Sequence, residues 1–295
     1  MRVLFLGGGG TLGAFSAGAL CALDEQGFSP DAVIGSSAGG INLLRWTAGG
    51  AAEAVRFWKD NARLSTIARG VLHGRNLSEG ILDARWFRAR VEEGVDFEQL
   101  RRDRRTLSFL VVDMETGRVS VRGNRTEPST PALRAVARGA YALPPLLPPV
   151  AFGGSLLADG GLLHNAPLNE AVKLGATSIV YVCNVHAIPR SGFRKPSSVR
   201  SAWRFAEIFF RRASNVGFVD ADIVDGRFRD VPFLAIAPPA NLAFGSLLRR
   251  MVPHIDAVQH LVDCGHESAL RAYSQWADYE AVSGPRSVEG VETLA

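Results

Sequence analysis

The sequence predicts an α/β fold with a mainly parallel, buried central sheet. Near the N-terminus, apolar strand-like runs at Val3–Leu6 and Ala32–Ile34 alternate with helix-like stretches at Ala14–Gln26 and Gly40–Ala48. A glycine-rich loop, residues 7–13, separates the first strand from the first helix. Strands and helices that alternate in this way form βαβ units, whose strands lie parallel and are covered by the helices.

Further elements follow along the chain. Residues 51–103 are charged and interrupted by glycines, so we expect short helices that cover one end of the sheet as a cap. The proline-rich loop at 143–149 is rigid, because its prolines fix φ and remove backbone donors. A Gly153-Gly154 turn leads into the next strand. The other expected elements are strands at Leu107–Asp113, Arg118–Arg122, Ser178–Cys183 and Val231–Ala237, and helices at Thr130–Arg138, Leu168–Leu174 and Pro253–Trp276.

The composition is typical of a globular protein held inside the cell. The chain has 295 residues and a formal net charge of +4, without the concentrated basic stripe that nucleic-acid binding requires. Its three cysteines, Cys21, Cys183 and Cys264, are far apart and without C-x-x-C spacing, which indicates a reducing compartment. The apolar N-terminal run is too short for a signal peptide, and no segment is apolar enough to span a membrane. We therefore expect a cytoplasmic location.

The first motif that carries chemistry is Gly35-Ser36-Ser37-Ala38-Gly39, of the form G-x-S-x-G. It stands between a predicted strand and a predicted helix. A serine on such a sharp turn is held in a strained backbone with its hydroxyl exposed, as a nucleophile must be. The pattern indicates acyl transfer, although glycine-rich turns without catalytic function share the same form.

A serine nucleophile needs donors that stabilise the oxyanion formed during attack. The loop that contains Gly8, Gly9, Gly10 and Gly13 supplies backbone N–H groups at the end of the first strand, on the same sheet edge as Ser37. The same glycines also fit the dinucleotide-binding pattern G-x-G-x-x-G. That alternative requires an acid at the end of the second strand, whereas Asp31 stands at its start.

A nucleophilic serine also needs a base, and the sequence offers two kinds. Asp159 precedes Gly160 and Gly161 at the end of a strand-like run and could accept the proton directly, although a simple turn aspartate looks the same. The other candidates are histidines: His254, His260 and His266 follow in the Ser-Asp-His order of α/β-hydrolases, and His164 lies near Asp159. In that fold, however, the nucleophile follows several strands, and here it follows the second.

Taken together, these motifs resemble the patatin-like phospholipase family. The resemblance rests on the glycine loop Gly8–Gly13, the G-x-S-x-G around Ser37 and the D-G-G triplet at Asp159. It is strongest over residues 2–184 and looser over 185–280. Supporting features are Val111–Gly117, the proline-rich approach Ala142–Val150, and Asn165 and Pro167.

The resemblance implies a single patatin-like domain over residues 1–280, with a three-layer α/β/α core, and a flexible tail at 281–295. It implies a Ser37–Asp159 dyad without histidine, an oxyanion hole in the glycine loop, and hydrolysis of lipid acyl esters with no metal or organic cofactor. Leu12 stands where the family commonly has Arg or Lys. This departure keeps a second possibility open, a non-catalytic lipid-binding or regulatory protein with the same fold.

The segment from Arg190 to Arg212 bears on the partners of the protein. It interleaves basic residues with large apolar ones such as Trp203 and Phe209. Such a pattern suits peripheral contact with an anionic membrane, and it equally suits a half-buried helix with solvated arginines. The expected partner is a lipid ester substrate; the sequence does not indicate an oligomeric state.

Overall fold

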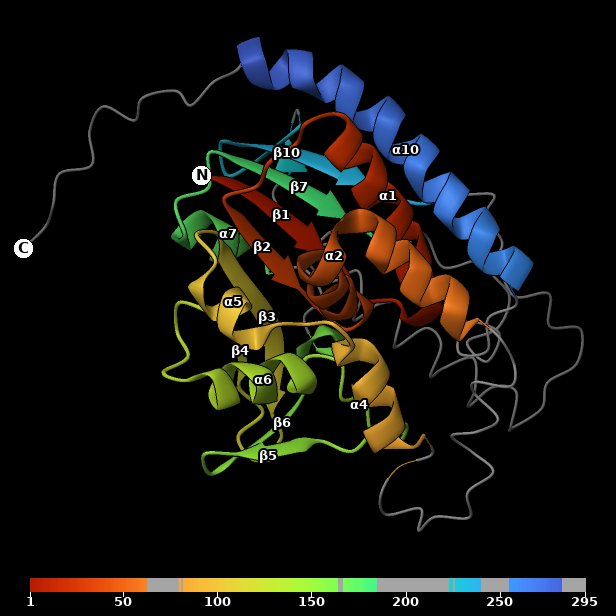
Figure 1. Cartoon of the computed structure of the whole chain (residues 1–295). Coiled ribbons are helices and arrows are strands. Elements are labelled where there is room, and N and C mark those ends of the chain that lie inside the picture. The colour runs from red at the N-terminus through yellow and green to blue at the C-terminus, as the bar shows by residue number, and fades with distance from the viewer. Residues whose placement is uncertain are drawn as a thin grey trace, which may run out of the picture.

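The computed structural model describes residues 1–62, 80, 82–163, 167–184, 223–224, 226–239 and 255–282, with the side chains of the last helix described to Trp276 (Figure 1). The strands are β1 (Arg2–Leu6), β2 (Ala32–Gly35), β3 (Thr106–Asp113), β4 (Val119–Gly123), β5 (Val150–Phe152), β6 (Ser155–Asp159), β7 (Ser178–Val182), β8 (Ile223–Val224), β9 (Arg227–Phe228) and β10 (Val231–Ile236). The helices are α1 (Gly13–Glu25), α2 (Ala38–Asn61), α4 (Ala84–Glu92), α5 (Phe97–Arg102), α6 (Thr130–Gly139), α7 (Leu168–Lys173) and α10 (Ile255–Val282), with short 3-10 helices at Gly10–Leu12 and Gly160–Leu162.

These strands form one sheet whose centre is parallel, as the βαβ alternation predicts. The parallel neighbours are β3, β2, β1, β7 and β10, in that order across the sheet. Antiparallel strands complete both sides: β4, β6 and β5 beside β3, and β9 and β8 beside β10. The predicted mainly parallel α/β sheet is confirmed.

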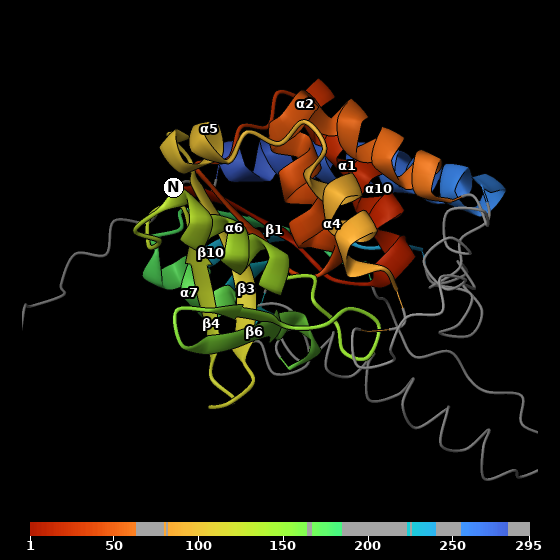
Figure 2. The same ribbon diagram turned by 60° about the horizontal axis from the view of Figure 1, so that its bottom comes forward.

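Helices cover both faces of the sheet. Along β1, Leu4 and Leu6 belong to one hydrophobic cluster with α1, α2 and α10, whereas Val3 and Phe5 belong to a second cluster with α7. Successive side chains of a strand point to opposite faces, so these two clusters are the two sides of the sheet. Figures 1 and 2 show α1, α2 and α10 together on one side and α7 on the other.

The long C-terminal helix α10 closes the domain against α1, as the sequence predicts. The two helices cross at glycines: a Cβ on Gly18 would lie 2.0 Å from the carbonyl oxygen of Val262, and a Cβ on Gly265 would lie 2.0 Å from that of Phe15. Only glycine permits so close an approach of two backbones. This crossing holds the C-terminal helix beside the N-terminal one (Figure 1).

The element α2 after Ser37 consists of two helical parts that meet at a kink. Gly49 and Gly50, with φ/ψ of −169°/27° and 79°/−176°, are non-helical and separate the part that starts at Ala38 from the part that ends at Asn61. The first part agrees with the helix predicted up to Ala48, and the second is a short helix of the kind expected from residue 51 onward. The expected short helices of the cap segment are α4 and α5; residues 63–79 and 81 lie outside the described residues.

Candidate active site

Ser37 occupies a sharp turn between β2 and α2, as the G-x-S-x-G pattern predicts. Its φ of 52° and ψ of −121° lie in a region that side-chain-bearing residues rarely adopt. The flanking glycines are required by close packing. A Cβ on Gly39 would lie 2.0 Å from the carbonyl oxygen of Leu6, and one on Gly35 would lie 2.8 Å from that of Gly39. The predicted strained turn at Ser37 is therefore present at the end of β2.

The length of β3 brings Asp159 to Ser37. One edge of β3 pairs with β4 along its length, since Ser108, Phe109, Val111 and Val112 all have partners there. The opposite edge pairs first with β2, up to Gly35 opposite Phe109, and then with β6, where Asp159 lies opposite Val111. Where β2 ends, β6 takes its place, so Ser37 and Asp159 reach the same level of the sheet.

Asp159 is buried, with 2% of its surface exposed, and its carboxylate is directly engaged. Its Oδ1 accepts the backbone N–H of Gly161 at 2.9 Å. Burial raises the pKa of Asp159 to about 7, while hydrogen bonds from the Ser37 side chain and from Gly161 lower that pKa in part. The carboxyl group therefore exchanges its proton near neutral pH, beside the Ser37 hydroxyl.

The glycine loop begins at the end of β1 and passes directly over the start of α2. Leu6 accepts the N–H of Ser36 at 3.1 Å, and a Cβ on Gly13 would lie 2.9 Å from the Cβ of Ala38. Within the described part of the chain, the N–H groups of Gly9 and Gly10 donate to no acceptor. Two unpaired donors next to the serine turn are suited to bind a negative oxygen.

Two buried asparagines hold this loop at its ends. Asn184 donates to the carbonyl of Gly7 at 2.7 Å and accepts from Ser16 at 2.6 Å. At the other end, Asn42 donates to the carbonyl of Gly13 at 2.8 Å. The sequence did not indicate that these two asparagines support the loop. An isolated Asn in a helix or after a strand carries no local signal of a tertiary contact.

Trp58 supports the contact between Asn42 and Gly13. Its indole N–H donates to the side-chain oxygen of Asn42 at 2.7 Å, and a Cβ on Gly13 would lie 2.3 Å from its ring. Trp58 lies in the second half of α2, so the kink at residues 49–50 returns this half of the helix to the loop.

Leu12 is 4% exposed and belongs to the main hydrophobic cluster, where a cation would have no place.

The histidines that follow Asp159 have other contacts. On α10, the His266 ring lies 2.8 Å from the carboxylate of Glu25 on α1, and the His260 ring lies 3.7 Å from the sulfur of Cys264. Among the recorded contacts of the described residues, neither histidine meets Ser37 or Asp159. His164, His254, Asn165 and the segment from Arg190 to Arg212 lie outside the described residues.

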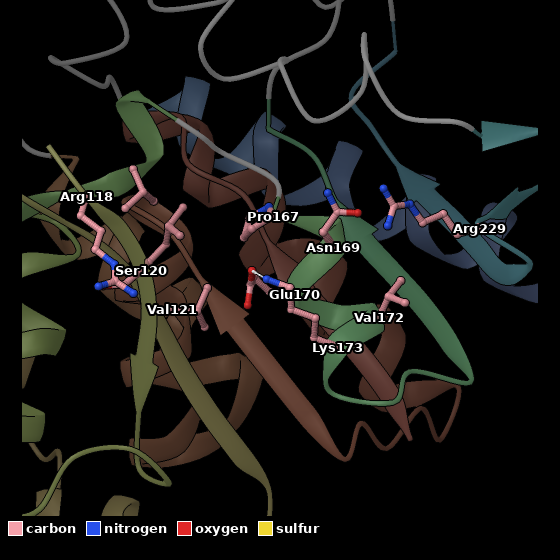
Figure 3. Close-up of a pocket in the computed structure, with 11 residues that line it drawn as sticks. Arg118, Ser120, Val121, Pro167, Asn169, Glu170, Val172, Lys173 and Arg229 are labelled. Carbon is pink, nitrogen blue, oxygen red and sulfur yellow. Dashed lines mark hydrogen bonds and ion pairs between the residues drawn. The ribbon is translucent and has the colours of Figure 1, made fainter. Parts of the chain in front are cut away.

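A separate groove of about 660 Å³ lies on the α7 side of the sheet, between β4 and α7 (Figure 3). Arg118 and Arg229 lie on its opposite sides, and between them Lys173 is paired with Glu170 at 2.7 Å. Neither Ser37 nor Asp159 lines it. This groove is therefore distinct from the pair of residues that the sequence singles out.

The chemistry and the surroundings of the protein also depend on whether it holds a metal-binding cluster or a helix that could span a membrane. In the described ranges, no group of three or more His, Cys, Asp or Glu side chains is arranged to hold a metal ion. None of the helices within those ranges combines the length and the apolar character that crossing a bilayer would require.

Comparisons with known proteins agree with the motifs. The family model for patatin-like phospholipase matches residues 4–172. A patatin-like phospholipase domain-containing protein of Caenorhabditis elegans, ZK370.4, is 31% identical over 195 residues, which are 63% of this chain and 14% of the relative. The lysophospholipase NTE1 of Meyerozyma guilliermondii is 29% identical over 191 residues, which are 61% of this chain and 12% of the relative. The chain thus spans about one seventh of these much longer proteins.

Two solved structures align with most of this chain at low sequence identity. VipD from Legionella pneumophila has a TM-score of 0.46 at 13% identity, and the match covers 93% of this chain and 67% of VipD. The type III effector protein ExoU has a TM-score of 0.42 at 14% identity, and the match covers 92% of this chain and 53% of ExoU.

Proposed function

The chain belongs to the patatin-like phospholipase family, and on that premise we propose that it is a serine acyl hydrolase that cleaves fatty-acyl esters of lipids with Ser37 as nucleophile and Asp159 as base. The family suggests lipid acyl hydrolysis in general, and the roles of Ser37 and Asp159 follow the dyad that the resemblance implies. The observation that carries it is that the buried carboxylate of Asp159, at the end of β6, lies beside the Ser37 side chain, which helps to lower its pKa.

The proposed reaction begins with proton transfer from Ser37 to Asp159. As the Ser37 Oγ bonds to the ester carbonyl carbon, the proton passes to the carboxylate, and the carbonyl oxygen becomes an oxyanion. The unpaired N–H groups of Gly9 and Gly10 suit this oxyanion. Gly8 precedes them in the proposed hole. Gly13, which the sequence also suggested, donates its N–H to the carbonyl of Gly10 and so closes the loop instead.

Collapse of the tetrahedral intermediate breaks the bond to the leaving alcohol, which takes the proton from Asp159 and leaves an acyl-Ser37 ester. In the second half, Asp159 accepts a proton from water, and the resulting hydroxide attacks the acyl carbonyl. The fatty acid leaves as the proton returns to the Ser37 Oγ. In each half of the reaction Asp159 accepts one proton and gives it back. A carboxyl group with a pKa of about 7 suits both steps, because it can do either near neutral pH.

A dyad without histidine is favoured by the contacts of the two described histidine candidates. His266 faces Glu25 and His260 faces Cys264, both on the α1–α10 side. The buried apolar Leu12 supplies no charge to the loop, but an oxyanion hole built from backbone N–H groups does not depend on the side chain at this position. A lipid-binding protein without catalysis is the second candidate that this departure keeps in view.

The test is a hydrolysis screen over phospholipid, lysophospholipid, triglyceride and short-chain esters. We expect release of fatty acid from at least one class, and loss of about 10³-fold or more in kcat for Ser37→Ala and Asp159→Asn. The control His266→Gln is expected to retain most activity. Loss of activity in His266→Gln would favour a triad, and a folded wild-type protein that cleaves no ester would favour the lipid-binding alternative.

A further inference from the structure

The segment Ala140–Ala142, here named the bridging segment, is bonded to the backbones of both proposed catalytic residues. The carbonyl of Ala140 accepts the N–H of Ser37 at 2.9 Å, and the carbonyl of Ala142 accepts the N–H of Asp159 at 2.9 Å. We propose that Tyr141, which stands between these two carbonyls, is the positioning residue that fixes Asp159 relative to Ser37. This inference rests on the proposed function.

The Tyr141 side chain is an anchor because of its burial. It is 4% exposed and belongs to the main hydrophobic cluster, and its ring meets Phe87 of α4 edge-on, with centroids 6.0 Å apart. A buried aromatic ring in such a setting has one packed position. The backbone on both sides of Tyr141 is therefore fixed by its side chain, and with it both accepting carbonyls.

The bridging segment also continues a supported helix. The N–H of Ala140 donates to Val136 of α6 at 3.0 Å, and that of Ala142 donates to Gly139 at 3.0 Å. An ion pair then joins the end of α6 to α4, between Arg138 Nη2 and Glu92 Oε2 at 2.8 Å. The Tyr141–Phe87 ring contact and this ion pair both join the end of α6 and the bridging segment to α4.

The ring of Tyr141, and not its hydroxyl, is the part that positions. Within the described residues, the hydroxyl oxygen is buried and has no hydrogen-bond partner. Removing the hydroxyl therefore breaks no hydrogen bond, whereas removing the ring leaves a cavity between the bridging segment and Phe87 of α4. A misplacement of about 1 Å between reacting groups costs up to about 100-fold in rate.

The experiment compares Tyr141→Leu with Tyr273→Leu. Tyr273 is a matched control on α10: it is 6% exposed and its ring meets Phe28 edge-on at 5.4 Å, far along the chain from the bridging segment. Both variants lose a buried ring, so both should unfold at lower urea concentration. We expect only Tyr141→Leu to lower kcat, by about 10- to 100-fold with little change in KM. Tyr141→Phe should restore kcat.

A second readout does not depend on turnover. The pKa of Asp159, followed by the ¹³C shift of its carboxyl carbon, should move in Tyr141→Leu and stay in Tyr273→Leu, because its hydrogen bond from Ser37 depends on their separation. If Tyr141→Leu does not fold, Phe87→Leu, which removes only the partner of the ring, is used with the same expectation.

The outcomes separate the two claims. An active wild-type enzyme whose kcat and Asp159 pKa are the same in both leucine variants would overturn the role of Tyr141 and leave the proposed function standing. A wild-type protein inactive on every ester would reject the proposed function, and the pKa comparison would then decide whether Tyr141 positions the pair.

Discussion

At the scale of single residues, the chemistry depends on one carboxyl group taken out of water. Asp159 keeps two hydrogen bonds that favour its charged form, from Ser37 and Gly161, yet burial dominates and raises its pKa to about 7. An ordinary surface aspartate would be too weak a base to take a serine proton effectively. Burial of this residue thus matches its proton affinity to the task.

This pKa leads to a prediction for activity. The base form of Asp159 must be present for attack, so kcat/KM should rise with pH through an apparent pKa near 7 and level off above it. The profile of a short-chain ester, measured from pH 5 to 9, checks this. An acidic limb centred near pH 4, the ordinary value for an aspartate, would contradict it.

The same shift predicts an effect on stability. The folded protein holds the Asp159 proton up to about pH 7, and the unfolded chain releases it near pH 3.8. Between these values the folded state binds more protons, so the stability that this group contributes falls as pH rises. Asp159→Asn removes the charge, and its stability relative to wild type should rise by a few kcal/mol from pH 4 to pH 8.

Urea unfolding of both proteins at pH 4, 6 and 8 measures this difference. Because all other titrating groups are shared, their effects cancel in the comparison of wild type with variant. A difference that is independent of pH would show that Asp159 titrates as an ordinary carboxylate.

At the scale of elements, the site exists because β3 is longer than its neighbour β2. The edge of β3 that β2 leaves after Gly35 is taken by β6, and this places Asp159 beside the serine turn. The sequence predicted both strands and both motifs, but not which edge each strand takes. Register between distant segments depends on packing, and no local pattern in the sequence encodes it.

The site also requires that the glycine loop be held in place, and α2 does this through Asn42. Asn42→Ala removes the donor to Gly13 and leaves both that carbonyl and the Trp58 N–H without a partner. We expect a loss of about 1–3 kcal/mol in unfolding free energy. If Gly13 shifts, the loop donors move, so kcat should also fall by about tenfold or more.

Asn61→Ala is the matched control for this prediction. Asn61 lies at the end of α2, and within the described residues its side chain donates to the carbonyl of Phe57, four residues earlier, at 2.7 Å and to no other acceptor. Its loss should leave kcat unchanged. Equal effects of the two variants on kcat would mean that the glycine loop does not depend on Asn42.

At the scale of the whole molecule, the crossing of α1 and α10 joins the two ends of the described fold. Gly265→Ala would place a methyl group 2.0 Å from the carbonyl oxygen of Phe15, so the helices must separate. We expect a loss of about 1–3 kcal/mol or more. Thermal unfolding checks this against Glu267→Ala, an exposed position on the same helix. If the two variants unfold alike, the close crossing is not needed.

The sequence predicted the parts of this molecule that depend on local pattern. The parallel sheet, the turn at Ser37 and the long closing helix all have short-range signals in apolar periodicity and glycine spacing. Two features had none: the asparagines at the ends of the glycine loop, and the bridging segment around Tyr141. Each depends on contacts between residues distant in the chain. The residue type alone, Asn or Tyr, does not reveal such a contact.

The most direct test of the Ser37–Asp159 account is covalent labelling with a fluorophosphonate, followed by peptide mass spectrometry. Such a reagent reacts with a serine whose hydroxyl has been activated by a base. The account predicts a single adduct on Ser37 in the wild-type protein, formed faster as pH rises through 7, and almost none in Asp159→Asn. An adduct on another residue, or equal labelling of Ser37 in Asp159→Asn, would contradict it.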